Sequence, residues 1–310
     1  MSPCLLVFHS CGLVRLPFQK DYMHGLPHIP RAALGPILLG SLLVLLLFWR
    51  SPPPRPLLAP PAAVGGLAPP ERPLPPGAPS PTIAPLAGQF LIRDQLQMAV
   101  ADGLYSDDER ERLAIDLERA LGYVAGRFAS GPTDRIIASV AVDPGCGLHG
   151  IAYTDVRTTQ VFSCPGVPRV RVVNIMAHEF VHQLAHDRYG DRHLKADMIL
   201  LEGVATWGAG SYWLGDQADF RSFVRGISRE TALLPLATSY AGRSIGDMNT
   251  LYYQWASFVE FLLKVYGRER FDALYVSGSS APGSADYYGV YGKSLPALEA
   301  EWSVWVMGNS

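Results

Sequence analysis

Proline is concentrated between positions 51 and 85, and this segment limits where the chain can fold. It contains four runs of consecutive prolines, at 52–54, 60–61, 69–70 and 75–76. Proline fixes φ and lacks a backbone N–H, so we expect this segment to be a semi-rigid extended linker without helix or sheet. The sequence therefore predicts a folded domain over residues 86–310, and we expect residues 1–30 to be disordered.

An uncharged, leucine-rich run over residues 32–49 lies between Arg31 and Arg50. A helix over this run would be about 27 Å long, close to the roughly 30 Å of a bilayer's hydrocarbon core. No small-residue cleavage site follows promptly, which favours a transmembrane anchor at 31–50 over a cleaved signal peptide and a secreted protein. Basic residues flank both ends and do not fix the orientation. We expect a cytoplasmic N-terminus and an extracytoplasmic domain.

Charge gives little indication of a macromolecular partner. The formal net charge is -2, and no cluster of lysine and arginine stands out along the chain. Nucleic-acid-binding proteins normally carry such a basic surface, so we expect no nucleic-acid partner. The sequence leaves the oligomeric state open.

The pattern of secondary structure along the folded domain predicts an α+β fold. Residues 89–101 have helical spacing, and Ser106 with Glu109 forms a capping box that opens a helix ending near Phe128. A buried strand is expected over 135–142, and a hairpin of strands 148–153 and 158–163 follows it. From Val170 onward the pattern is mostly helical, and its last element covers 295–306.

Two cysteines flank the predicted hairpin. A hairpin centred near residue 155 places Cys146 and Cys164 opposite each other. A disulfide there is expected if the domain lies in an oxidising compartment, and two unpaired buried thiols are the alternative.

The motif His178-Glu179-Phe180-Val181-His182 indicates a metal site. Residues four apart share one face of a helix, so both imidazoles can reach a single ion. Neutral imidazole is a preferred zinc ligand, and a glutamate between the two can take a proton from water at the metal. The alternative is that the two histidines are ordinary core or surface residues of a helix, beside a solvated Glu179.

A third ligand is needed, and Glu202 is the candidate. It lies on an otherwise apolar helical segment twenty positions after His182, which leaves room for a turn and a second helix. A carboxylate buried on such a face must be paired or bound to a metal. His186 is a rival, but it lies about 12 Å along the helix from His178. His193 is the second rival, but the chain would have to turn tightly after His182 to bring it to the metal. Such a turn would need a glycine three positions after His182, where the sequence has Ala185.

These motifs resemble those of the gluzincin zinc metallopeptidases, and more closely the peptidase MA-like group. The resemblance rests on H-E-F-V-H at 178–182 and L-E-G-V-A-T-W at 201–207, with looser likeness at 252–259, 266–267, 292–295 and 298–302. It covers roughly 135–305, and it departs from the family at 198–199, where Met-Ile replaces an aromatic residue. It implies a zincin-like domain, in which a small antiparallel or mixed sheet precedes a helical C-terminal part.

The resemblance also implies roles for individual residues. His178, His182 and Glu202 match the ligands of Zn²⁺, and Glu179 matches the general base. Tyr252 matches a residue that stabilises the oxyanion, with Tyr253 next to it as the second choice. In a separate expectation, Thr206 supports the site from one turn beyond Glu202.

The expected function is a membrane-anchored, zinc-dependent peptidase that acts on a peptide or protein substrate. The expected strands at 147–163 offer only Asp155 as an acidic group for a substrate's free amine, which favours an endopeptidase over an exopeptidase. One alternative is a catalytically inactive or non-peptidase zincin-fold envelope protein with a binding role. Action on a non-peptide amide is another. An intramembrane protease is disfavoured, because residues 170–186 carry Arg171, Glu179 and three histidines.

Overall fold

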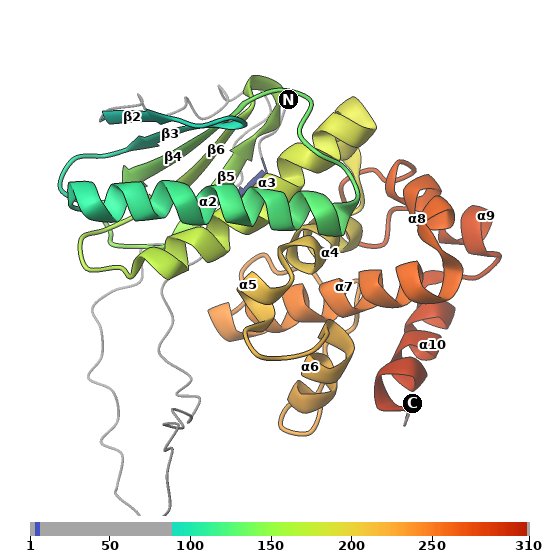
Figure 1. Cartoon of the computed structure of the whole chain (residues 1–310). Coiled ribbons are helices and arrows are strands. Elements are labelled where there is room, and N and C mark those ends of the chain that lie inside the picture. Colours follow the sequence, from blue (N-terminus) through green and yellow to red (C-terminus); the bar gives the residue numbers. More distant parts are fainter. Residues whose placement is uncertain (1–3, 7–88, 309–310) are drawn as a thin grey trace, which may run out of the picture. The chain divides into compact units, whose positions relative to one another are not determined.

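The computed structural model describes residues 4–6 and 89–308, and the fold is given for these residues (Figure 1). The anchor expected at 31–50 and the linker expected at 51–85 lie outside them. Among the helices of the described residues, none is both long and apolar enough to cross a membrane.

A mixed six-stranded sheet forms one layer of the fold, in the order β1-β5-β6-β4-β3-β2. Strand β4 runs parallel to β3 and β6, and the remaining neighbours are antiparallel. The strands are β1 (Cys4–Leu6), β2 (Gln89–Ile92), β3 (Leu96–Val100), β4 (Ile136–Val142), β5 (His149–Tyr153) and β6 (Thr158–Ser163). The sequence pattern predicts no strand at β1, which has only three residues.

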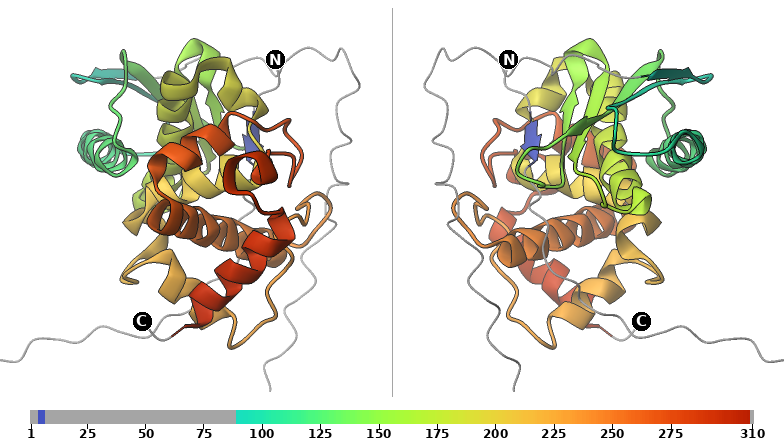
Figure 2. Two further views of the ribbon diagram at one scale, coloured as in Figure 1. Left: turned by 90° about the vertical axis from the view of Figure 1, so that its right-hand side faces the viewer. Right: turned by 90° about the vertical axis from the view of Figure 1, so that its left-hand side faces the viewer.

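Helices make up most of the other described residues. Helices α2 (Asp107–Phe128) and α3 (Arg169–Tyr189) pack against each other beside the sheet, and most later helices lie beyond α3 (Figures 1 and 2). The later helices are α4 (Met198–Ala209), α5 (Ser211–Leu214), α6 (Phe220–Ile227), α7 (Ile245–Tyr266), α8 (Arg268–Tyr275), α9 (Tyr287–Tyr291) and α10 (Leu295–Met307). Two 3-10 turns, η1 (Thr154–Val156) and η2 (Gly190–Lys195), join elements around α3. The arrangement is α+β, as the sequence predicts.

The prediction of helical spacing over 89–101 is wrong, because this segment forms the hairpin β2–β3. Residues 96, 98 and 100 are all buried and alternate along β3. Residues 96, 99 and 100 are also buried and share one face of a helix, so the apolar pattern alone fits either element. Hydrogen bonding to the parallel strand β4 decides between the two.

The capping box at the start of α2 is confirmed. The Ser106 hydroxyl accepts a hydrogen bond from the Glu109 amide at 3.4 Å, and the Glu109 carboxylate accepts one from the Ser106 amide at 2.9 Å. These bonds satisfy two amide groups at the helix start that would otherwise lack partners.

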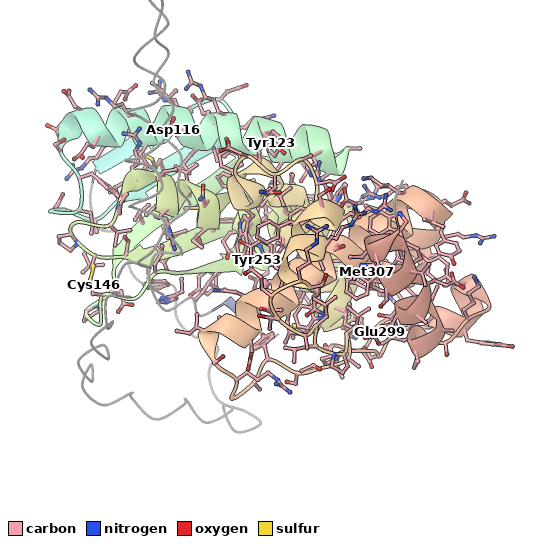
Figure 3. All side chains as sticks on the ribbon, turned by 90° about the horizontal axis from the view of Figure 1, so that it is seen from below. Asp116, Tyr123, Cys146, Tyr253, Glu299 and Met307 are labelled. Atoms are coloured by element: carbon pink, nitrogen blue, oxygen red, sulfur yellow. A yellow bond between two sulfur atoms is a disulfide. The ribbon has the colours of Figure 1, made fainter. Side chains whose placement is uncertain are left out.

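The hairpin after β4 is also confirmed. Strands β5 and β6 pair from His149 with Phe162 to Tyr153 with Thr158. Beyond this pairing Cys146, labelled in Figure 3, forms the predicted disulfide with Cys164, with their Cα atoms 5.0 Å apart. The disulfide therefore joins the two ends of the hairpin that borders α3.

Two glycines let α4 approach its neighbours closely. A Cβ atom on Gly203 would lie 2.8 Å from the Trp255 carbonyl oxygen of α7. A Cβ atom on Gly208 would lie 2.7 Å from a methyl group of Val181 on α3. Helix α4 is thus held at short distance between α3 and α7.

Gly203→Ala should destabilise the protein by about 1–3 kcal/mol, because the added methyl group meets main-chain atoms that cannot rotate away. Gly122→Ala is the matched control: it lies in the exposed middle of α2, with open space around its Cβ position. Alanine there should stabilise the helix by up to about 1 kcal/mol. Urea unfolding of both variants measures the difference, and equal effects would contradict the close α4–α7 packing.

Candidate metal centre

Two histidines of α3 point into the same buried volume. His178 and His182 lie one turn apart, in a part of α3 whose residues are all buried from 175 to 185. Their Nε2 atoms are 3.1 Å apart, and the rings meet at 72°. This is the face-sharing that the four-residue spacing predicts.

Glu202 reaches the same place from α4. The chain leaves α3 at Tyr189, passes through η2 and returns as α4. The Glu202 Oε2 atom lies 3.2 Å from His178 Nε2 and 3.6 Å from His182 Nε2. Within residues 4–6 and 89–308, these three side chains form the one group of three or more potential ligands whose donor atoms lie within 4.8 Å of one another.

The protonation states of His178 and Glu202 suit a divalent cation. Desolvation lowers the pKa of His178 to about 4, so its ring is neutral at pH 7. Burial raises the pKa of Glu202, but hydrogen bonds from His178 and His182 outweigh it and hold that pKa at about 2. Neutral imidazoles and one carboxylate are the donor set of many three-ligand zinc sites, so these residues fit the ion.

Glu179 lies on the same helix between the two histidines and is fully buried. Neither of its carboxylate oxygens has a hydrogen-bond partner among the described residues. Burial, and then the charge of Glu202, raise the pKa of this carboxyl well above its ordinary value. A carboxyl group in this setting favours either a nearby positive charge or a bound proton.

Gly150 of β5 makes room for the Glu179 carboxylate. A Cβ atom at position 150 would lie 2.9 Å from the Glu179 Cδ atom and 2.6 Å from a methyl group of Ile175. The sequence analysis did not select this residue, although a glycine inside a strand often marks a close approach of another group. Strand β5 can therefore pack closely against the Glu179 carboxyl group.

Tyr252 of α7 faces the metal-ligand group and Tyr253 does not. The Tyr252 ring is buried, 6.0 Å from the His178 ring and parallel to Trp213. The hydroxyl of Tyr253, labelled in Figure 3, donates to the Trp213 carbonyl oxygen at 3.5 Å, and its ring packs on Phe223. Of the two tyrosines, Tyr252 is therefore the one that lies beside the metal-ligand group.

Thr206 contacts His178 from one turn beyond Glu202. Its hydroxyl lies 3.4 Å from His178 Nδ1, on the ring edge opposite the ligand group. Such a contact orients a ligating imidazole. Trp213, which the sequence analysis did not select, packs its ring 5.3 Å from the ring of His178.

The two rival histidines bind elsewhere. His186 Nδ1 lies 2.6 Å from the hydroxyl of Thr154, and His193 Nδ1 lies 2.9 Å from the hydroxyl of Tyr275. Neither belongs to the group that His178 forms with its neighbours.

Comparison with known proteins gives only distant likenesses. No protein-family model matches the sequence, and no curated protein is similar to it. Solved structures with a likeness include an M1 zinc metallopeptidase from Deinococcus radiodurans, with 21% identity and a TM-score of 0.35. A mutant of that metallopeptidase has 19% sequence identity with this chain and a TM-score of 0.35. A two-domain M1 zinc metallopeptidase mutant bound to L-arginine has 21% identity and a TM-score of 0.37.

The likeness covers 69% of this chain in each case, and the chain spans about half the length of those proteins, 48–49%. Similarity at this level assigns neither a family nor an activity.

Glu179→Gln should make the metal-free protein more stable at pH 8 than the parent. The folded protein binds the Glu179 proton more tightly than the unfolded chain does, so protonation of Glu179 stabilises the fold. This stabilisation is fully present below pH 4.5 and is lost as the pH rises through the raised pKa of Glu179. Glutamine at 179 does not titrate, and the difference between variant and parent should shrink at pH 5.

Urea unfolding of chelator-treated protein at the two pH values measures this effect. Glu230→Gln, on an exposed turn, makes the same chemical change and should alter stability little at either pH. A parent more stable than Glu179→Gln at pH 8 would show that the Glu179 carboxylate is stabilised in the fold.

Proposed function

We propose that this chain is a zinc-dependent peptidase of the gluzincin type. The observation that carries the proposal is the convergence of His178, His182 and Glu202, from two helices, beside the buried carboxyl of Glu179. A structural zinc site has four protein ligands, whereas a catalytic one keeps three and an open position. The described residues offer three ligands and a neighbouring acid–base group, which supports a catalytic role.

Each residue of the site has a separate task in this proposal. A bound zinc ion supplies Lewis-acid polarisation of the substrate carbonyl and acidifies water. Glu179 takes a proton from the attacking water on a carboxylate oxygen and later gives it to the leaving amine. The burial of Glu179 supports this role, because a raised pKa lies closer to the pH at which it must both accept and release a proton.

Tyr252 is proposed to stabilise the negative charge that develops on the carbonyl oxygen. Its ring lies against His178, and a phenol can donate a hydrogen bond to that oxygen. Thr206 and Trp213, which contact or pack against His178, hold that ligand in place.

An endopeptidase is favoured over an exopeptidase. Strand β5, which lies beside Glu179 at Gly150, carries no carboxylate in the sequence His-Gly-Ile-Ala-Tyr. Asp155 is exposed in η1, beyond the end of the strand. A free substrate amine therefore has no acidic partner along this strand.

The proposed location is the membrane, with residues 31–50 as the anchor and the folded domain extracytoplasmic, an arrangement in which residues 4–6 do not keep their pairing with β5. The disulfide between Cys146 and Cys164 supports an oxidising compartment. Protease added to intact cells should digest the domain. Digestion only after lysis would contradict the extracytoplasmic location.

The purified protein should contain about one zinc per chain and cleave unstructured peptides with both ends blocked. Glu179→Gln should keep the zinc and lose activity by about 10²–10⁴-fold, because the base is missing but the ligands remain. Metal analysis and a peptide library analysed by mass spectrometry measure both effects. Zinc in both proteins without cleavage in either would favour a binding role, and cleavage only from free N-termini would overturn the endopeptidase assignment.

Tyr252→Phe should lower kcat by about 10²–10³-fold with a small change in KM, because the lost hydrogen bond forms as charge develops on the oxygen. Tyr253→Phe is the matched control, since it removes a neighbouring phenol hydroxyl directed at the Trp213 carbonyl. It should leave kcat nearly unchanged. A larger loss in Tyr253→Phe than in Tyr252→Phe would reverse the assignment.

A further inference from the structure

Asp197 is a fully buried carboxylate outside the ligand group. It is the residue before α4, the helix that carries Glu202, and its side chain caps that helix by accepting a hydrogen bond from the Ile199 amide at 2.9 Å. Among the described residues it has no ion-pair partner within 4.0 Å. A neutral serine or asparagine can fulfil the capping role, so the cost of burying a charge here calls for a further reason.

Three further donors reach the same carboxylate from a distant part of the chain. Oδ1 also accepts a hydrogen bond from the Gly283 amide at 3.1 Å. Oδ2 accepts from the Ala285 amide and from the Tyr287 hydroxyl, each at 3.0 Å. A carboxylate has two oxygens and accepts about four hydrogen bonds, whereas the single oxygen of asparagine accepts about two. Only an acidic side chain can satisfy all four donors.

The segment that supplies these donors is packed directly on the start of α4. A Cβ atom on Gly278 would lie 2.9 Å from the Ala196 carbonyl carbon and 3.1 Å from the Asp197 Cα atom. The Ser280 amide donates to the Lys195 carbonyl oxygen at 3.0 Å. The N-terminal end of α4 is therefore held in a fixed position against residues 278–287.

We propose that Asp197 is a positioning residue that sets the affinity of the metal site, by fixing the start of α4 and with it the carboxylate of Glu202. This inference rests on the metal site of the proposed function, although it does not require peptidase activity. Gly203 fixes how close α4 lies to α7, and Asp197 fixes where α4 lies along and around its axis. Ligand positions in a metal site must hold to about 0.5 Å, which gives this anchoring its effect on the metal.

The test compares zinc affinity and the cobalt spectrum in full-length variants. Asp197→Asn keeps an acceptor for Ile199 and Gly283 but loses one for Ala285 and Tyr287, and zinc affinity should fall by about tenfold or more. Tyr287→Phe removes one of the four hydrogen bonds without changing a charge, and a fall of a few-fold is expected. Both variants should alter the visible absorption of the cobalt-substituted protein, which reports ligand geometry.

Asp219→Asn is the matched control. Asp219 caps α6, a helix without a metal ligand, by accepting a hydrogen bond from the Ser222 amide at 2.8 Å. Asparagine keeps an acceptor for this cap, so the replacement should change the stability of the apo-protein little and leave zinc affinity and the cobalt spectrum unchanged. Competition with a coloured chelator measures affinity, and urea unfolding of the apo-protein measures stability.

Parental zinc affinity and cobalt spectra in both Asp197→Asn and Tyr287→Phe, with lowered stability, would show that Asp197 only stabilises the fold. That outcome would overturn the inference. If Asp197→Asn does not fold, the milder Tyr287→Phe still decides between the two results. A parent protein that binds no zinc would overturn the metal site itself, which is a distinct result.

Discussion

The burial of ionisable groups between α3 and α4 is the constraint on which the rest of the structure depends. His178, His182, Glu179 and Glu202 are all inaccessible to solvent and lie within two helices that touch. Burial, and then the charge of the neighbouring Glu202, raise the pKa of Glu179 well above its ordinary value. A divalent ion bound between these groups would offset both effects, which is the physical basis for the proposed metal site.

Glycines at two contact positions let the surrounding elements pack closely around these groups. Gly150 lets β5 approach Glu179 from the sheet, and Gly203 lets α7 approach α4 from the other side. Helix α3 lies between these two contacts and carries three of the four groups. The sheet and the helical part therefore meet at the site, and neither layer builds it alone.

The parts of this site that depend on local spacing were predictable from the sequence. The four-residue interval between His178 and His182 fixes their common face in any helix, and the capping box at Ser106 is equally local. The hairpin and its disulfide follow from strands joined by a short turn. Glu202 was predictable as a ligand because a lone carboxylate on an apolar helical segment needs a cation or a hydrogen-bond donor when it is buried.

The parts that depend on distant partners were not predictable in this way. The spacing of β3 suits a helix too, and the strand forms because its alignment with β4 pairs Leu96 with Ile136, forty positions later. Three of the four donors that hold Asp197 lie more than eighty positions after it, and no pattern near residue 197 indicates them. Gly150 and Glu179 likewise meet only through packing of β5 on α3. Pattern and spacing thus identify the candidate metal ligands and Glu179, while the residues that position them become evident only in the folded chain.

Strand β1 bears on how the proposed site would bind a peptide substrate. Leu6 pairs with Gly150, so β1 occupies the edge of β5 beside Glu179. A membrane-spanning helix at 31–50 would put residues 4–6 and β5 on opposite sides of the bilayer, so this pairing and that anchor exclude each other within one molecule. An anchored chain would therefore expose the β5 edge with unpaired main-chain groups. Such an edge is what an extended peptide pairs with, and here it passes directly beside the proposed general base.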